Sequence, residues 1–286
     1  LVDRIRNGQN LIYSFYMGMG LPFFRNFFNY LSSPFNIILF LFKHSDLLMS
    51  YSVIIGLKAV AAAGTMNYYL RKKFNDNKNL FFIALSLLYA FSAYFTAYYW
   101  NIMWLDGMVF LPLITLGIEN IINDKKPLLY IISLAIMLFA NYFIAYMLCL
   151  FSVLYFVIYM FIKFDKFEFK KILKKCLIFS ISSFLAAGLC AFFLVPLYDA
   201  IKGISATSDV FPTSQYYSFT FKEFIFNHLS AVGSTVLKSG ITSAPNISCG
   251  ITMVALLITF IINPKINIKI KSSYLFLLAF IMISFV

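Results

Sequence analysis

Charged residues are scarce in this chain, and acidic residues are the scarcest of them. Only 12% of the 286 residues are charged, while 62% are hydrophobic. Soluble domains carry about a quarter of their residues as charged ones. A soluble protein of this length needs a polar exterior that this composition cannot supply. The sequence therefore excludes an ordinary soluble domain and predicts an integral membrane protein.

Metal-binding and nucleotide-binding patterns are also missing. The two histidines, His44 and His228, lie far apart, and the four cysteines form no CxxC pair. Neither a P-loop nor a GxGxxG motif is present. These absences argue against a zinc site, a disulfide framework and an ATP-driven pump within this stretch. No cofactor is indicated, and a divalent metal ion is left open.

Apolar runs dominate what is present. A helix needs about 20 mostly apolar residues to cross a bilayer. Residues 127–162 form a stretch of 36 residues without a charge, which is long enough for two spans that turn near Asn141 and Tyr142. The sequence thus predicts an all-α, polytopic transmembrane helical bundle of about eight spans. The other six runs are residues 47–70, 80–98, 105–122, 174–197, 248–262 and 273–286.

The placement of Lys and Arg supports this count and gives an orientation. If the loop at residues 71–79 is cytoplasmic, the inner loops hold fifteen Lys and Arg, the outer segments hold seven, and Lys58 lies inside a run. This bias follows the positive-inside rule. The net charge of +12 then reflects topology and attraction to anionic lipid, so nucleic acid is not an expected partner.

One transmembrane domain is expected over residues 1–286. Residues 1–46 form the first outer loop, 47–198 six spans, 199–247 a long outer loop, and 248–286 two further spans, the last of them truncated. We expect partly helical outer loops, and the apolar stretch 35–42 is too short to span, which favours an interfacial or re-entrant element. The chain starts at Leu1 without an initiator Met, so it is expected to be the middle of a longer protein.

Two charged residues inside spans are candidates for function. Asp106 lies just inside the outer end of a span, where a carboxylate must face protein or water. It either orients a substrate hydroxyl or a cation, or is an interfacial Asp favoured by a helix start. Lys58 lies near the middle of its span and must face the bundle, towards a carboxylate or a lipid phosphate, or snorkel. A structural ion pair and a ligand role are both open for it.

Aromatic and amide side chains gather at the same outer level. Trp100 and Trp104 are spaced i, i+4, and are expected on one face, where they form an aromatic belt or stack on a sugar ring. Asn141, Tyr142 and Tyr146 cap the predicted hairpin at this level. Asn141 at a tight turn also has a purely local explanation.

Several short motifs occur in the order of a known family. The chain resembles the YfhO family of bacterial multi-span membrane proteins, which is similar to the GT-C glycosyltransferases. The motifs are Asn7-Gly8, Tyr13-Ser14-Phe15, Gly18-Met19-Gly20, Tyr30-Leu31-Ser32-Ser33-Pro34-Phe35-Asn36, Trp100-Asn101-Ile102-Met103-Trp104-Leu105-Asp106 with Pro112, Asn141-Tyr142 with Tyr146, Pro245-Asn246-Ile247 and Cys249-Gly250.

This resemblance implies an enzyme of the bacterial cytoplasmic membrane whose active face is outward. It would move a sugar from a polyprenyl-phosphate donor to a cell-surface polymer acceptor such as lipoteichoic acid. The family's catalytic carboxylate is expected upstream of Leu1, so none is assigned here. Phosphate-binding candidates are Arg4, Arg6, Arg25, Lys202, Lys222 and Lys238; sugar-binding candidates are Trp100, Trp104 and Tyr142, with Asp106 and Asn141 on hydroxyls.

Two other classes of protein compete with this reading. A transporter or flippase for a lipid-linked sugar would use the same aromatics and Lys58, with its site near the bilayer midplane. The polar residues instead crowd the outer surface, which favours the enzyme. A non-catalytic partner of another membrane enzyme is the third alternative.

Overall fold

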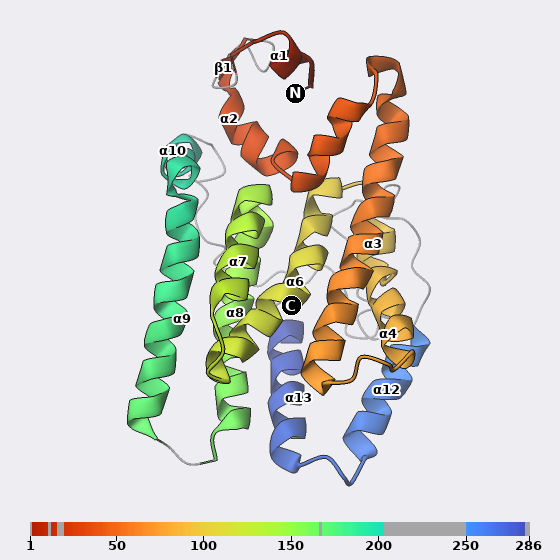
Figure 1. The fold of residues 1–286 in the computed structure, drawn as a ribbon, viewed down its shortest axis with the longest axis vertical. Helices are drawn as coiled ribbons and strands as arrows, with labels where there is room; N and C mark the ends of the chain where they lie inside the picture. The colour runs from red at the N-terminus through yellow and green to blue at the C-terminus, as the bar shows by residue number, and fades with distance from the viewer. Residues whose placement is uncertain (1, 11–12, 16–19, 166–167, 203–249, 284–286) are drawn as a thin grey trace, which may run out of the picture.

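The structure is a computed structural model that describes residues 2–10, 13–15, 20–165, 168–202 and 250–283. Long helices run side by side, and the N-terminal segment lies across one end of them (Figure 1). The described residues contain one short sheet, in which β1 (Tyr13–Ser14) pairs antiparallel with β2 (Leu21–Pro22). The predicted all-α polytopic bundle is confirmed.

Helices occupy the described part of every predicted run. Within the described residues, five stretches are long and apolar enough to cross a membrane, and α7 and α12 are shorter apolar helices. Because α7 has 13 residues, its length is about 20 Å, short of the roughly 30 Å hydrocarbon core. The count of eight spans therefore stays a prediction. The helices are α3 (Leu47–Phe74), α4 (Phe81–Ala90), α5 (Ala93–Tyr98), α6 (Leu105–Ile122), α7 (Leu128–Ala140), α8 (Tyr142–Lys163), α9 (Phe169–Leu189), α10 (Ala191–Lys202), α12 (Ile251–Ile262) and α13 (Ile268–Ile283).

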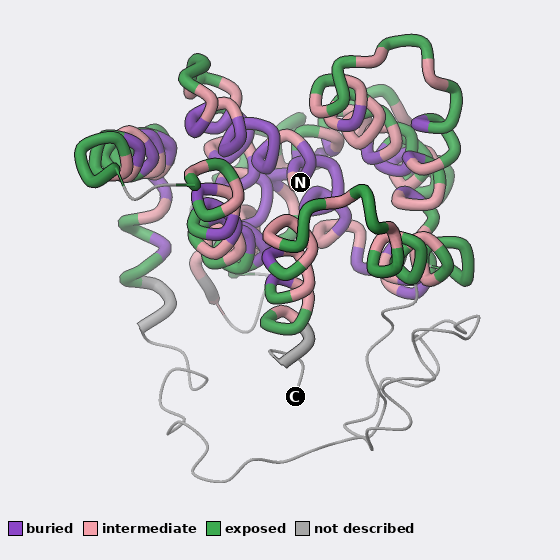
Figure 2. Tube along the Cα trace, turned by 90° about the horizontal axis from the view of Figure 1, so that it is seen from below, coloured by how far each residue is buried: buried purple, intermediate pink, exposed green. Residues whose placement is uncertain are grey.

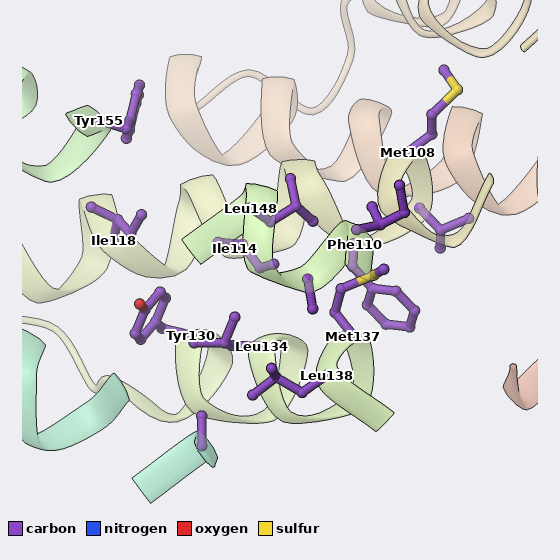
Figure 3. Packing of buried hydrophobic residues seen from close by; sticks show 14 of the residues in the cluster. Met108, Phe110, Ile114, Ile118, Tyr130, Leu134, Met137, Leu138, Leu148 and Tyr155 are labelled. Carbon is purple, nitrogen blue, oxygen red and sulfur yellow. The ribbon is translucent and has the colours of Figure 1, made fainter. Parts of the chain in front are cut away.

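The central helix is α6, which is buried along most of its length and packs against α3, α7, α8 and α9. Gly117 allows close approach of α7, because a Cβ there would lie 2.6 Å from the backbone of Tyr130. Figure 3 shows side chains of α6, including Ile114 and Ile118, beside Leu134 of α7. Buried residues lie in the middle of the bundle and exposed ones at its rim (Figure 2).

The rim is apolar, as expected for a surface that faces lipid. Phe184 of α9, Leu150 and Val157 of α8, and Val60 of α3 are all exposed. In water such a surface would be unfavourable, because leaving an apolar side chain exposed instead of burying it costs about 1.5–3 kcal/mol. In a bilayer the same surface is solvated by acyl chains.

The N-terminal segment is built from short elements. They are α1 (Val2–Arg6), the two strands, α2 (Phe23–Asn26), the π-helical η1 (Phe27–Leu31), and the 3-10 helices η2 (Pro34–Leu41) and η3 (His44–Asp46). They cover the start of α6 and the α7–α8 turn. We call this end of the bundle the Asp106 end, and the opposite end, where α3 and α6 finish, the Lys73 end.

Two predicted spans differ from the structure. The run at 174–197 is instead α9, which begins at Phe169 and ends at Leu189, followed by α10. Lys170, Lys171, Lys174 and Lys175, which are among the predicted inner-loop residues, lie in the first turns of this helix. Long basic side chains can reach a membrane surface from such helical positions. The run at 80–98 is divided between α4 and α5 at Phe91 and Ser92. Residues 203–249, which include most of the predicted outer loop at 199–247, lie outside the described residues, and residues 199–202 belong to α10.

Candidate functional site

A buried ion pair joins α3 to α6 at the Asp106 end. The Lys58 ammonium donates to Asp106 Oδ2 at 2.8 Å and to the carbonyl oxygen of Ile102 at 2.8 Å. Both charged side chains are 0% exposed. The ring of Phe35 lies 5.5 Å from the Lys58 nitrogen. The lysine inside the span thus faces the bundle and a carboxylate, which was one of the expected arrangements.

The second oxygen of Asp106 is also engaged. The Ser33 hydroxyl donates to Asp106 Oδ1 at 3.0 Å, and Ser33 is buried just before η2. Asp106 is the second residue of α6, so the positive end of the helix dipole further favours its negative charge. A carboxylate with both oxygens occupied and no exposure is better suited to holding structure in place than to removing a proton.

The predicted turn at Asn141 is confirmed, and it contacts the N-terminal segment. Asn141 Oδ1 accepts from the backbone nitrogen of Ile144 at 2.9 Å, which caps α8. Its amide nitrogen donates to the carbonyl of Asn29 at 2.8 Å. The Ser32 hydroxyl donates to the carbonyl of Ala140 at 3.1 Å. Neighbouring residues Ser32 and Ser33 therefore attach the N-terminal segment to α7 and α6.

The two tryptophans do not share a helix face, which corrects the i, i+4 prediction. The chain leaves α5 after Tyr98 and re-enters a 3-10 turn at Ile102, so Trp100 lies in the connection between them. Trp104 is half-buried, and its ring centroid lies 5.6 Å from that of Tyr98. Trp100 is partly exposed, and its carbonyl accepts from the Tyr51 hydroxyl at 2.6 Å.

The remaining candidates are dispersed. Tyr142 is half-buried and Tyr146 is exposed on α8. Arg4 donates to the carbonyls of Asn10 and Tyr13 and to the Ser14 hydroxyl. The side chains of Arg25 in α2 and Lys202 in α10 are not among those described, and Lys222 and Lys238 lie outside the described residues.

A second ion pair, which sequence reasoning missed, lies at the Lys73 end. Glu119 Oε1 accepts from Lys73 at 2.7 Å, Tyr69 at 2.9 Å and Tyr155 at 2.6 Å. Lys73 also donates to the Tyr274 hydroxyl of α13 at 3.2 Å. An acid inside an apolar run is the signal that could have found it, because such a group requires a partner.

Acidic, histidine and cysteine side chains do not cluster in the described part of the chain, where no group of three or more lies close enough to hold a metal ion. What the Asp106 end brings together is instead a neutralised charge pair, two serine hydroxyls, a capped turn and several aromatic rings.

Comparisons with known proteins place the chain among bacterial membrane proteins. The sequence model of a family described as "Bacterial membrane protein YfhO" matches residues 1–286. A protein of Bacillus subtilis (strain 168), named "Uncharacterized protein YfhO", is 32% identical over 99 residues. That match covers 35% of this chain and 11% of the relative, so the matched part is a small share of that protein. No solved structure matches the chain.

Proposed function

Because this chain belongs to the YfhO family of bacterial membrane proteins, we propose that it is part of a membrane glycosyltransferase. It would transfer a sugar from a polyprenyl-phosphate carrier to a cell-surface polymer such as lipoteichoic acid, on the outer face of the cytoplasmic membrane. The Asp106 end would then face outward, in agreement with the concentration of Lys and Arg in the opposite loops.

The observation that carries this proposal is the buried Lys58–Asp106 pair with Ser33 at the end of the bundle where aromatic and polar side chains gather. Charged groups within spans are costly and are typical of functional sites. A transferase acting on a lipid carrier needs its binding surfaces near the membrane interface, where the carrier's phosphate resides. This end of the bundle offers such surfaces.

Within this proposal, different residues have different roles. Asp106, Lys58 and Asn141 are positioning residues, because their polar atoms are already bonded inside the protein. Trp104 and Trp100 are the candidates for stacking on a sugar, since each residue is partly exposed. The phosphate leaves with little acid assistance, so the reaction mainly requires a base for the acceptor hydroxyl.

The proposal is tested by assaying transfer from a labelled polyprenyl-phosphate sugar in membranes that contain the full-length parent protein. We expect Asp106→Asn and Trp104→Ala to lower transfer by at least tenfold while the protein remains folded. Asp124→Asn, which changes an exposed acid at the Lys73 end, is the matched control and should retain transfer. Unchanged transfer in both test variants would contradict these roles.

One observation supports the transporter alternative. The helix at residues 81–98 is interrupted between α4 and α5, and broken helices are a feature of transporters. The same membranes therefore serve a second assay, in which movement of the labelled lipid between leaflets is measured. Leaflet exchange without sugar transfer would replace the glycosyltransferase proposal with a flippase.

A further inference from the structure

The level of the membrane at the Asp106 end can be estimated from α3. This helix has 28 residues, or about 42 Å, which exceeds the roughly 30 Å hydrocarbon core. Basic residues from Arg71 to Lys73 mark its end at the headgroups. About 20 residues before Arg71 the helix reaches Tyr51. Tyr51 bonds to Trp100, and both are partly exposed, as in an aromatic belt at the interface.

Ser33 then lies inside the hydrocarbon level. Lys58 is seven residues beyond Tyr51, so it lies about 10 Å below the belt. Ser33 shares that depth, because both residues bond to Asp106. From Ser33, the eight residues of η2 rise about 16 Å. The segment thus reaches the level of the belt about midway along η2, and its last residues and Lys43 lie at the headgroup level.

Exposed apolar side chains accompany this climb. Ile37 and Leu41 of η2 are 71% and 82% exposed, and Leu48 in the first turn of α3 is 85% exposed. We call residues 33–51 the η2–α3 hairpin; its two arms contact each other. If the hairpin is inserted, Ile37 contacts acyl chains and the two leucines contact the headgroup boundary; if it is not, all three side chains face water.

Two cations lie at the top of the hairpin. Arg6 Nη2 donates to the carbonyls of Phe40 at 3.1 Å and Phe42 at 3.3 Å, which fixes the guanidinium beside Lys43. Lys43 is exposed, and the structure shows no salt bridge for it within the described residues. The nearby Asp46 accepts from the Ser45 hydroxyl. The remaining guanidinium donors and the ammonium can therefore face a phosphate.

From these observations we infer that the η2–α3 hairpin inserts into the leaflet at the Asp106 end and binds an anionic phospholipid there. The upper part of an acyl chain lies along Ile37, while Leu41 and Leu48 lie at the boundary with the headgroups, and the phosphate contacts Arg6 and Lys43. The cations and the exposed apolar side chains near them match the charged and the apolar part of such a lipid. This inference does not depend on the proposed transferase activity.

Insertion is tested by spin labelling of the full chain in nanodiscs after the four native cysteines are replaced. Nitroxides are attached at Ile37→Cys and Leu41→Cys. Val60→Cys, on the exposed face of α3 within the membrane, and Ser45→Cys, at the hairpin top, are the references. Residue 37 should be accessible to oxygen, like residue 60, and residue 41, which lies nearer the headgroups, should fall between residues 60 and 45. Insertion would be overturned if residue 37 were as accessible to a water-soluble nickel chelate as residue 45.

Lipid binding is tested by native mass spectrometry of the purified chain with equal phosphatidylglycerol and phosphatidylcholine. We expect the double variant Arg6→Gln/Lys43→Gln to lower the preference for phosphatidylglycerol by roughly fivefold per cation. The control is Lys125→Gln/Lys126→Gln, two exposed lysines at the Lys73 end, which should leave the Arg6 and Lys43 contribution intact.

The single variant Lys43→Gln guards against misfolding, because it breaks none of the hydrogen bonds that hold α1 to η2. It should still lose part of the preference. An unchanged preference in both test variants would overturn the inference. The same measurement is made with undecaprenyl phosphate. If the two cations affected binding of undecaprenyl phosphate and not of phosphatidylglycerol, the inference would also be overturned, because the bound lipid would then be the carrier lipid.

Discussion

Replacing Lys58 with methionine removes the ammonium that neutralises Asp106 and keeps a side chain of similar length. The carboxylate would remain 0% exposed, with Ser33 as its remaining side-chain donor. Removing one partner of a buried ion pair costs about 3–5 kcal/mol, because the other charge is left uncompensated. Polar contacts inside membrane proteins are weaker than this, since the unfolded state in the membrane also finds partners. We therefore expect a loss of about 3 kcal/mol.

A double-mutant cycle separates the interaction free energy between Lys58 and Asp106 from the effect of each substitution on its other contacts. The unfolding free energy is measured in mixed detergent micelles for Lys58→Met, Asp106→Leu and the variant with both changes. The double variant should be more stable than the sum of the single losses predicts, by about 2 kcal/mol, because no unpaired charge remains. Replacing a buried pair by apolar residues is often neutral.

The control is Lys72→Met on the same helix, where the ammonium is exposed and the expected change is within about 0.5 kcal/mol. The reasoning would be refuted if Lys58→Met behaved like this control. It would also fail if the two single losses simply added in the double variant, because the ion pair would then contribute no coupling between α3 and α6.

The remaining predictions concern the core and the Lys73 end. Gly117→Ala should lower the unfolding free energy by about 1–3 kcal/mol, because the added Cβ meets the backbone of α7. Gly64→Ala, where the added Cβ has open space, should leave the unfolding free energy unchanged or raise it by up to about 1 kcal/mol. Glu119→Gln should lower it by about 1–3 kcal/mol, measured in the same micelles, because the half-buried Lys73 loses its counter-charge. A hydrogen bond from Lys175, and then its charge, lowers the pKa of Asp124, so its stabilising effect is present above the unfolded value of about 3.9 and is lost as the pH falls below it. Melting temperatures of wild type and Asp124→Asn should thus differ at pH 7 and converge as the pH falls through the lowered pKa of Asp124 in the folded protein, and a constant difference would contradict this.

The helices could be predicted because a membrane leaves the backbone few choices. In lipid, each N–H and C=O must be bonded within the protein, so an apolar run of sufficient length becomes a helix. The break at Asn141 followed from the length of its run and the turn preference of Asn. The breaks at Phe91 and Cys190 were not predicted, because neither position differs in hydropathy from the helices on either side.

The candidate site was predictable in its residues and not in its contacts. Lys58 and Asp106 are each identifiable from the sequence as a charge inside a span. That they neutralise each other follows only from the packing of α3 against α6 in the structure. Ser33 carries no such signal, since a serine is common in loops and its partner lies 73 positions away. Glu119 carries the same signal as Lys58, a charge inside an apolar run, so its need for a partner was predictable from the sequence.

The two ion pairs together define how α3 lies against α6. The lysines are 15 residues apart on α3, or about 22 Å, and the carboxylates are 13 apart on α6, or about 20 Å. Both pairs can form at once only if the helices run in the same direction and in one register, because a slip of one turn, about 5.4 Å, would separate both. Since Ser33 is bonded to the first pair and Tyr274 to the second, the N-terminal segment and α13 are both attached to this fixed helix pair, at opposite ends.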